Sequence, residues 1–502
     1  MLLVHLTSDN AFLGRYTTSV LPFFINNQIN KQMSRFNTTK PTGTTNLAGG
    51  KAYKESKEMQ LVSILLTSFG DSKYYEKNTD TYKRLENLIS ECDKLFCAKA
   101  IVYARTVFGM RTITHYAASI LAKHIGGEEW GKDFYNKVVN RPDDMTEIIA
   151  CHLARKQKIT NAMKKGFATA LGRFDDYQLA KYKGEGKEVK LVDVVNLVHP
   201  TQTAKNNFAI SKLVNGELKS HDTWESELSA VGNDSEAKKA IWNRLLDERK
   251  LGYFALLRNL RNIISLGDES LKRKALTALV DRNAIKKSLV LPFRFATAYD
   301  ELSKIDTDAM RAISKACEIA CDNVPKFDGK TLVALDVSGS MSSARVSDIA
   351  SLFSAILLKS NNCDLITFAD DAKYRMVNPD DSVMTIKNAI RYACGGTNFP
   401  SVFETANKKY DRVILLSDMQ SWVQNSFWVS SPKVAYEAYK RRFNVPHCKF
   451  YSFDLAGYGT LQMPENDVFL LAGFSDKIFD LMSYLETDKR AILKAIDEIS
   501  LK

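Results

Sequence analysis

The residues with the clearest potential chemistry follow an apolar segment at 331–335. Asp336, Ser338 and Ser340 stand at alternate positions directly after that segment. One carboxylate and two hydroxyl groups on a single turn are ligands that a hard divalent cation prefers, and they leave a coordination position open for an outside ligand. The segment therefore predicts a site for a divalent cation, in the first place Mg²⁺, with Mn²⁺ or Ca²⁺ as alternatives.

Two later segments offer further oxygen ligands. Thr397 follows a glycine-rich turn, and Asp418 comes at the end of an apolar segment at 413–416. In an open parallel sheet, the loops at the carboxyl ends of the strands converge on one crevice, so residues far apart in the sequence can share one ion. The alternative is that Ser338 and Ser340 cap a following helix, a frequent use of serine. The presence of all three segments favours the metal site.

These residue types and their order resemble the metal-ion-dependent adhesion site of von Willebrand factor A domains. The resemblance is carried, position by position, by Asp336, Ser338, Ser340, Thr397 and Asp418. It implies that these five residues bind the metal.

Helical and strand-like patterns divide the chain into two parts. From residue 325 onward, short β-branched or aromatic segments alternate with helical ones, which predicts a doubly wound α/β domain with a parallel sheet. The expected strands lie at 332–336, 365–368, 413–416 and 450–453, and the expected helices at 347–358, 383–392 and 432–442. Before the break at Pro325 and Gly329, apolar residues recur at helical spacing, as at 57–69, 82–95, 98–108, 113–124 and 254–264. That part is predicted to be an all-α, HEAT-like array of stacked helix pairs.

We therefore expect three regions: an N-terminal arm at 1–45, a helical-repeat domain at 46–324 and the α/β domain at 325–502. The arm is rich in Asn and Thr between residues 10 and 46. Met33 is a candidate for the physiological start of the protein. Alternatively, residues 1–32 form a poorly ordered extension.

The positive charge is concentrated in the helical part. Residues 325–502 hold 21 basic and 21 acidic side chains, so the other 49 of 70 basic and 37 of 58 acidic side chains lie in 1–324 and account for the whole excess of +12. Such a field attracts polyanions, either nucleic acid or an anionic membrane face. No apolar run approaches the roughly 20 residues of a spanning helix. Residues 1–6 are largely apolar but lack the basic lead-in and small-residue cleavage site of a secretory signal, so we do not expect one. We expect a cytoplasmic protein that binds nucleic acid, with eight reduced cysteines.

One stretch stands out as a candidate RNA surface. Residues 148–174 contain no Asp or Glu, and their basic side chains are Arg155, Lys156, Lys158, Lys164, Lys165 and Arg173. Like charges repel on a helix, so such a run favours a nearby anion. We expect Arg155 and Lys158 to share one helical face that Lys165 continues. The alternative is a solvated helix face without a ligand.

Taken together, the two parts resemble the Ro autoantigen family, and the bacterial members more than the animal ones. The segments that carry the resemblance are 46–50 (NLAGG), 69–75 (FGDSKYY), 108–112 (FGMRT), 181–183 with Asp193 and His199-Pro200, 254–260 (FALLRNL), 291–294 (LPFR) and 471–475 (LAGFS). It implies a ring of helical repeats, the TROVE module, closed by a von Willebrand factor A domain. It also implies that Lys181, Lys183 and His199 contact RNA, although a lone histidine before a proline more often caps a helix.

The function implied by the resemblance is RNA binding. A Ro-type protein would hold small Y-like noncoding RNA and the single-stranded 3′ ends of misfolded RNA, and would present structured RNA to an exoribonuclease as a quality-control adaptor. No catalytic motif is found, so we expect no enzyme. The alternatives are a metal-dependent protein adhesion scaffold without a role in RNA biology and, less favoured, a metal-dependent phosphodiesterase, for which two carboxylates are few.

Overall fold

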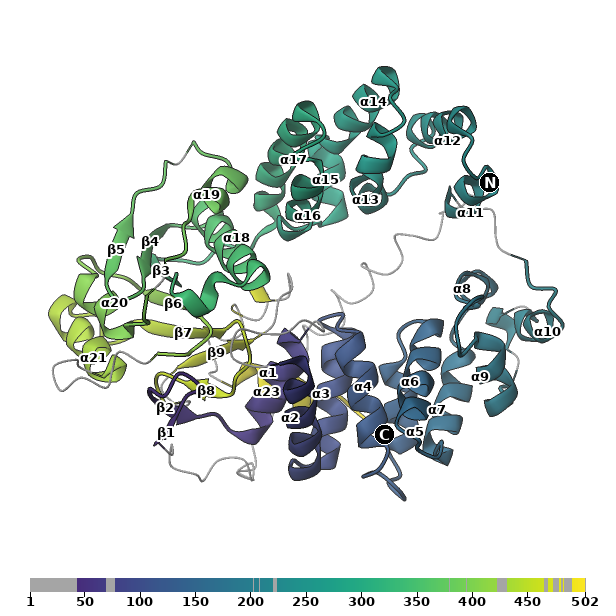
Figure 1. Cartoon of the computed structure of the whole chain (residues 1–502), viewed down its shortest axis with the longest axis horizontal. Helices are drawn as coiled ribbons and strands as arrows, with labels where there is room; N and C mark the ends of the chain where they lie inside the picture. The colour runs from purple at the N-terminus through teal and green to yellow at the C-terminus, as the bar shows by residue number, and fades with distance from the viewer. Residues whose placement is uncertain are drawn as a thin grey trace, which may run out of the picture.

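The computed structural model describes most of the chain after its first 42 residues (Figure 1). The described residues are 43–68, 77–201, 203–206, 208–219, 224–378, 380–393, 395–421, 431–464, 468–472, 478–479, 482 and 490–501. The candidate start at Met33, most of the expected N-terminal arm and the segment 69–75 lie outside these ranges.

The first part is helical, and its helices follow one another along an arc (Figure 1). They are α1 (Lys57–Thr67), α2 (Asn78–Glu91), α3 (Lys94–Thr106), α4 (Thr112–Leu121), α5 (Gly131–Val138), α6 (Pro142–Ala154), α7 (Asn161–Leu171), α8 (Asp176–Lys181), α9 (Leu191–Val198), α10 (Ala209–Val214), α11 (Trp224–Ala230), α12 (Ser235–Asp247), α13 (Tyr253–Ile264), α14 (Glu269–Leu279), α15 (Arg282–Ser288), α16 (Phe293–Leu302) and α17 (Thr307–Ala320). Aspartate side chains start several of them: Asp93 accepts a hydrogen bond from the Phe96 amide at 2.8 Å. Such caps satisfy amide groups that the first helical turn leaves without a partner.

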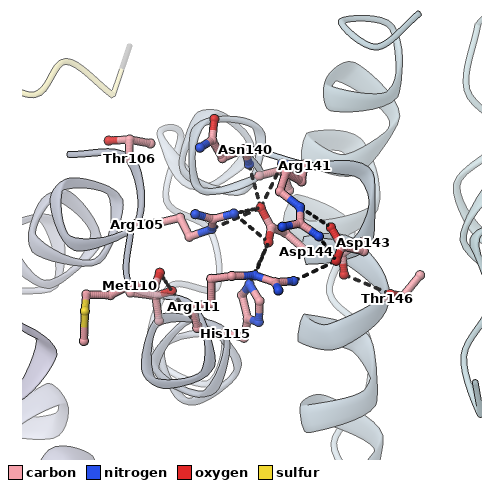
Figure 2. A network of polar contacts seen from close by, with 12 residues as sticks. Arg105, Thr106, Met110, Arg111, His115, Asn140, Arg141, Asp143, Asp144 and Thr146 are labelled. Atoms are coloured by element: carbon pink, nitrogen blue, oxygen red, sulfur yellow. Dashed lines mark hydrogen bonds and ion pairs between the residues drawn. The ribbon is translucent and has the colours of Figure 1, made fainter. Parts of the chain in front are cut away.

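A buried carboxylate, Asp144, ties α3, α4 and α6 together (Figure 2). Arg105 donates to both of its oxygens, at 2.7 and 2.9 Å, and the His115 ring lies 2.9 Å from Oδ1. The amides of Asn140 and Arg141 donate to Oδ2 at 2.8 and 2.9 Å. Burial alone would raise the pKa of Asp144, but the hydrogen bond with His115 and the charge of Arg105 outweigh it, so the pKa lies below its usual value.

The second part is an α/β domain with a six-stranded sheet in the order β5-β4-β3-β6-β7-β9. The strands are β3 (Thr331–Asp336), β4 (Cys363–Phe368), β5 (Ala372–Arg375), β6 (Arg412–Ser417), β7 (Lys449–Asp454) and β9 (Phe469–Ala472), all parallel except β5. The helices are α18 (Ala344–Ser360), α19 (Val383–Ala389), α20 (Phe399–Thr405), α21 (Pro432–Phe443) and α23 (Ala491–Asp497).

Both faces of this sheet are covered. Val333 and Leu335 belong to the apolar cluster that includes Phe353 of α18, whereas Leu332 and Ala334 belong to the cluster that includes Phe403 of α20. A parallel strand buried on both faces needs an uninterrupted apolar sequence, which is what the segment before Asp336 provides. The predicted fold class, an all-α helical-repeat region followed by a doubly wound von Willebrand factor A-type domain, is confirmed.

The α/β domain contacts both ends of the helical arc. At the C-terminal end, the ring of Phe293 in α16 stacks on Phe353 of α18 at 5.9 Å. At the N-terminal end, a hairpin of β1 (Gly43–Thr45) and β2 (Lys51–Lys54) pairs through β2 with β8 (Thr460–Leu461). This hairpin was not expected from the sequence, and it places the start of the helical region on the α/β domain. No helix in the described ranges is long and apolar enough to span a membrane.

Replacing Asp144 with Asn should destabilise the protein by about 3–5 kcal/mol, because the buried guanidinium of Arg105 would lose its counter-charge. The native pKa of Asp144 is depressed, so its contribution is present above the unfolded value near pH ~4 and is lost only as the pH falls below it. Urea denaturation at pH 7, 5 and 3 would measure both effects.

The exposed pair of Lys57 and Glu91 provides the control, since Glu91→Gln removes a charge that water already solvates. It should leave the unfolding midpoint unchanged. Equal midpoints for Asp144→Asn and wild type at pH 7 would contradict the role given to this carboxylate.

Candidate metal centre and nucleic-acid interface

The predicted metal ligands converge at the carboxyl ends of adjacent strands β3 and β6. Asp336 ends β3 and Asp418 directly follows β6, and both are buried. Asp336 Oδ1 accepts a hydrogen bond from the Ser338 amide at 2.9 Å, and Oδ2 accepts one from the Ser417 hydroxyl at 2.5 Å. The strand register therefore brings two carboxylates that are 82 positions apart (418 less 336) to one edge of the sheet.

The hydroxyl ligands lie in the loops around these carboxylates. Ser338 Oγ and Ser340 Oγ are 3.4 Å apart. The loop that carries Thr397 is bound to the first loop, because the Gly339 amide donates to the Gly395 carbonyl at 3.4 Å. The same loop is also bound to the loop that carries Asp418, because the Ser421 hydroxyl donates to the Thr397 carbonyl at 2.5 Å. All the predicted ligands are buried, and their three loops lie together as expected.

The charges of this site are poorly compensated by the protein itself. Burial raises the pKa of Asp336 to about 6. Burial, and next the negative charge of Asp336, raise the pKa of Asp418 to about 8. Asp418 Oδ2 makes no hydrogen bond within the described part of the chain. A divalent cation would neutralise both carboxylates and use this free oxygen, so the residues fit a metal with oxygen ligands.

Hydroxyl groups are essential to this candidate centre. Among the residues that the structure describes, no three His, Cys, Asp or Glu side chains gather in a way that could hold a metal ion. Two carboxylates with Ser338, Ser340 and Thr397 leave less negative charge around an ion than a cage of carboxylates. Such a site retains affinity for an outside anionic ligand.

The basic stretch at 148–174 does not form the continuous helical face that we predicted. Helix α6 ends at Ala154, and Lys156 adopts a left-handed conformation with φ of 54°. The following turn is fixed by the His152 ring, which lies 2.8 Å from the Lys158 carbonyl, before Thr160 caps α7. The expected shared face of Arg155, Lys158 and Lys165 is therefore wrong, because a turn separates Arg155 from α7.

Four of the predicted RNA-binding side chains already have partners in the protein. Arg155 pairs with Glu86 and donates to the Tyr116 hydroxyl at 2.8 Å. Arg173 donates to the carbonyls of residues 136 and 139, at 2.5 and 2.7 Å. Lys181 pairs with Glu225 at 2.9 Å, and Lys183 donates to the carbonyl of residue 218 at 2.9 Å. These four contribute to the packing of the helices, whatever else they bind.

The other four are on the surface. Lys158, Lys165 and His199 are exposed, and Lys164 is partly exposed. Lys164 and Lys165 lie on α7, and His199 ends α9 in a left-handed conformation with φ of 46°. Contacts of these four with RNA remain a prediction.

A cavity of about 620 Å³ is a further candidate site that the sequence did not reveal. Its walls come from the turn between α3 and α4 and from helices α13 and α16. Phe254, 41% exposed, lies beside two guanidinium groups, with Arg258 at 5.9 Å and Arg294 at 5.7 Å from its ring. The walls include three segments that also carry the resemblance in the sequence, 108–112, 254–260 and 291–294. The spacing of these segments along the chain does not indicate that they meet.

Residues 215–326 match the family model of the TROVE domain. The proteins named telomerase protein component 1 of Mus musculus and Rattus norvegicus are 20% and 21% identical, over 50% of this chain and 13% of each relative. The chain thus spans only a small part of the curated relatives that it matches.

The solved structures give a match over nearly the whole fold. The crystal structure of the Ro (RSR) protein of Deinococcus radiodurans has a TM-score of 0.59 at 19% identity, over 88% of this chain and 100% of that chain. The TROVE match and the shared fold confirm the resemblance to the Ro family.

Replacing Asp418 with Asn should have opposite effects with and without metal. In EDTA near neutral pH, the variant should melt at a higher temperature than the wild type, because on folding Asp418 must either take up a proton or keep its charge beside Asp336, and an asparagine need do neither. Saturating Mg²⁺ should stabilise the wild type by about 3 kcal/mol at a hundredfold excess over Kd and should not stabilise the variant. Thermal melting in the two buffers measures both effects.

Asp380→Asn is the matched control, since Asp380 is exposed and outside the site. It should respond to Mg²⁺ like the wild type. A wild-type protein whose melting temperature is the same in EDTA, Mg²⁺ and Mn²⁺ would contradict the metal centre.

Proposed function

We propose that this protein is a Ro-type RNA-binding protein and not an enzyme. The observation that carries the proposal is the cavity between the α3–α4 turn and helices α13 and α16, in which Phe254 stands beside Arg258 and Arg294. An exposed aromatic ring can stack on an unpaired base, and guanidinium groups can bind the neighbouring phosphates. That combination suits a single strand of RNA better than a duplex, whose bases are already stacked.

The bound RNAs would be small Y-like noncoding RNA and misfolded RNA with a single-stranded 3′ end. The single strand would occupy the cavity, and structured RNA would bind the outer cations Lys158, Lys164 and Lys165 together with the side chain of His199. The excess of positive charge in residues 1–324 supports such a division, because phosphate contacts account for much of RNA affinity. In this proposal the protein acts in the cytoplasm as a quality-control adaptor that presents RNA to an exoribonuclease.

The α/β domain would add a metal-dependent contact. Asp336, Ser338, Ser340, Thr397 and Asp418 would hold the ion, most simply Mg²⁺, and the bound ion would attract a carboxylate or phosphate of a partner. The orphaned Asp418 Oδ2 supports this part of the proposal. The same feature favours the second candidate function, a metal-dependent protein adhesion scaffold without a role in RNA biology.

Charge reversal in the cavity should remove the preference for single-stranded tails. Arg258→Glu/Arg294→Glu should weaken binding of a hairpin RNA with a 3′ tail about 10- to 100-fold and bring it to the level of a tailless duplex. If each arginine neutralises one phosphate, the slope of log K against log salt should fall by about 1.4. Filter binding across a salt series gives both quantities.

Lys326→Glu/Lys409→Glu, with the same change in charge on exposed residues of the α/β domain, is the matched control. It should keep the preference for a tail. Weak RNA binding by the wild type, unaltered in the cavity variant, would favour the adhesion scaffold.

The outer surface is best tested without Arg155, whose reversal would also break its pair with Glu86. Lys158→Glu/Lys164→Glu/Lys165→Glu should weaken binding of the duplex and of the tailed RNA by a similar factor, about tenfold or more, and lower the salt slope. Equal affinities of variant and wild type for the duplex would contradict an RNA surface on this part of the arc.

A further inference from the structure

Asn46 begins the turn between β1 and β2 and is buried, although it lies at the very start of the described chain. Its side-chain oxygen accepts hydrogen bonds from the amides of Ala48 and Gly50, at 3.1 and 2.8 Å. Because the oxygen is used within the turn, the amide nitrogen of the side chain is left for another partner. That partner is the carbonyl of Ser421, at 2.6 Å.

Ser421 belongs to the loop that carries the candidate metal ligand Asp418. Its hydroxyl donates to the carbonyl of Thr397, another candidate ligand, at 2.5 Å. Asn46 is therefore connected to Thr397 through a single residue, although 375 positions separate it from Ser421.

A second connection runs through Gln420. The Leu47 amide, next to Asn46, donates to Gln420 Oε1 at 2.8 Å. The Gln420 amide in turn donates to Asp418 Oδ1 at 3.1 Å, and the side-chain nitrogen of Gln420 lies 3.3 Å from the Asp418 carbonyl. The hairpin thus reaches the carboxylate of Asp418 by way of one residue, Gln420.

The loop between Asp418 and Ser421 needs such support. Met419 has a φ of 61°, a left-handed conformation that residues with a β-carbon rarely adopt. It is held there by Gln462, which donates to the Met419 carbonyl at 2.8 Å, and by the bonds that join the next two residues, Gln420 and Ser421, to the hairpin. A backbone in a disfavoured conformation keeps it only where the surroundings fix it.

From these contacts we infer that Asn46 and Gln420 are positioning residues of the metal centre, and that the hairpin in front of the helical region is a structural part of that centre. The inference rests on the proposed metal site. The hairpin fixes Asp418 and Thr397 in the places from which both can bind one ion. The segment Asn46-Leu-Ala-Gly-Gly50 then has a specific role: an Asn that turns the chain and bonds to the metal loop.

Asn46→Asp separates the two tasks of this side chain. An aspartate can still accept the amides of Ala48 and Gly50, but it cannot donate to the Ser421 carbonyl. We expect the affinity for Mn²⁺, measured by isothermal titration calorimetry on the full chain, to fall about 10- to 100-fold, as for residues that orient metal ligands. The added negative charge alone would raise the affinity for a cation, so a loss identifies misplaced ligands.

A second measurement does not depend on metal. In EDTA, hydrogen exchange of peptides that cover 412–421 should be faster in Asn46→Asp than in the wild type, because the bonds from the hairpin to Gln420 and Ser421 are weakened. Lys51→Ala, an exposed residue of β2 in the same hairpin, is the control and should change neither affinity nor exchange.

The outcomes separate the inference from the metal site itself. Weaker Mn²⁺ binding together with faster exchange supports the inference. Wild-type affinity in Asn46→Asp overturns it, whatever the exchange rate, and leaves the metal centre standing. No Mn²⁺ binding by the wild type overturns the metal centre and the inference with it, and normal tail-dependent RNA binding in the same preparation would show that the RNA proposal survives.

Discussion

The attachment of the α/β domain to both ends of the helical arc is the constraint on which the interior of the molecule depends. At one end Phe293 stacks on Phe353 and on Phe479, each at 5.9 Å. At the other end β2 pairs with β8, and Lys99 of α3 donates to the carbonyl of Asp497 at 2.5 Å. The cavity exists only because of this closure, since one wall comes from the α3–α4 turn and the other from α13 and α16. Repeating helices alone would hold each wall near its sequence neighbours, not the two walls near each other.

Buried carboxylates are used in two contrasting ways. Asp144 receives donors from a guanidinium, an imidazole and two backbone amides, so its negative charge is matched inside the protein and its pKa is depressed. Within the described part of the chain, Asp336 and Asp418 receive only hydroxyl and amide donors. Burial raises the pKa of both, and at Asp418 the negative charge of Asp336 adds to the effect. The first arrangement is complete and serves stability. The second leaves Asp418 Oδ2 without a donor in the described part of the chain, which makes it a candidate binding site.

Much of the fold could be predicted from the sequence because it depends on local patterns. The segment 332–335 before Asp336 is apolar at every position, which favours a strand covered on both faces, and β3 is found at Thr331–Asp336. The loops of Asp336 and Asp418 could be predicted because these residues directly follow such strands, whereas Thr397 lies between α19 and α20 and directly follows no strand in the described chain. Parallel strands in register then bring those loops together without further information.

The failures come from contacts between distant or irregular segments. The hairpin at 43–54 is short, and its partner β8 lies about 400 residues away, beyond any local pattern. The basic face at 155–165 was wrong because the left-handed residue Lys156 interrupts a run of good helix formers. Formal charge also overstated the cations available to RNA, since Arg155 and Arg173 are engaged within the protein. A charge count measures the field of a surface and does not say which side chains are free to use it.

Phe293 connects the two candidate sites physically. Its side chain lines the cavity beside Arg294, and the same ring stacks on Phe353 in the middle of α18. Helix α18 begins directly after the loop of Ser338 and Ser340, so one helix carries a loop of the candidate metal centre at its start and supports the cavity wall further along. Phe293 is partly buried and Phe353 is fully buried, so Phe353 cannot turn without opening a void and holds the ring of Phe293 in place. The α/β domain is therefore more than a closure for the arc: its position, fixed at the hairpin and at Phe293, sets how far apart the walls of the cavity stand.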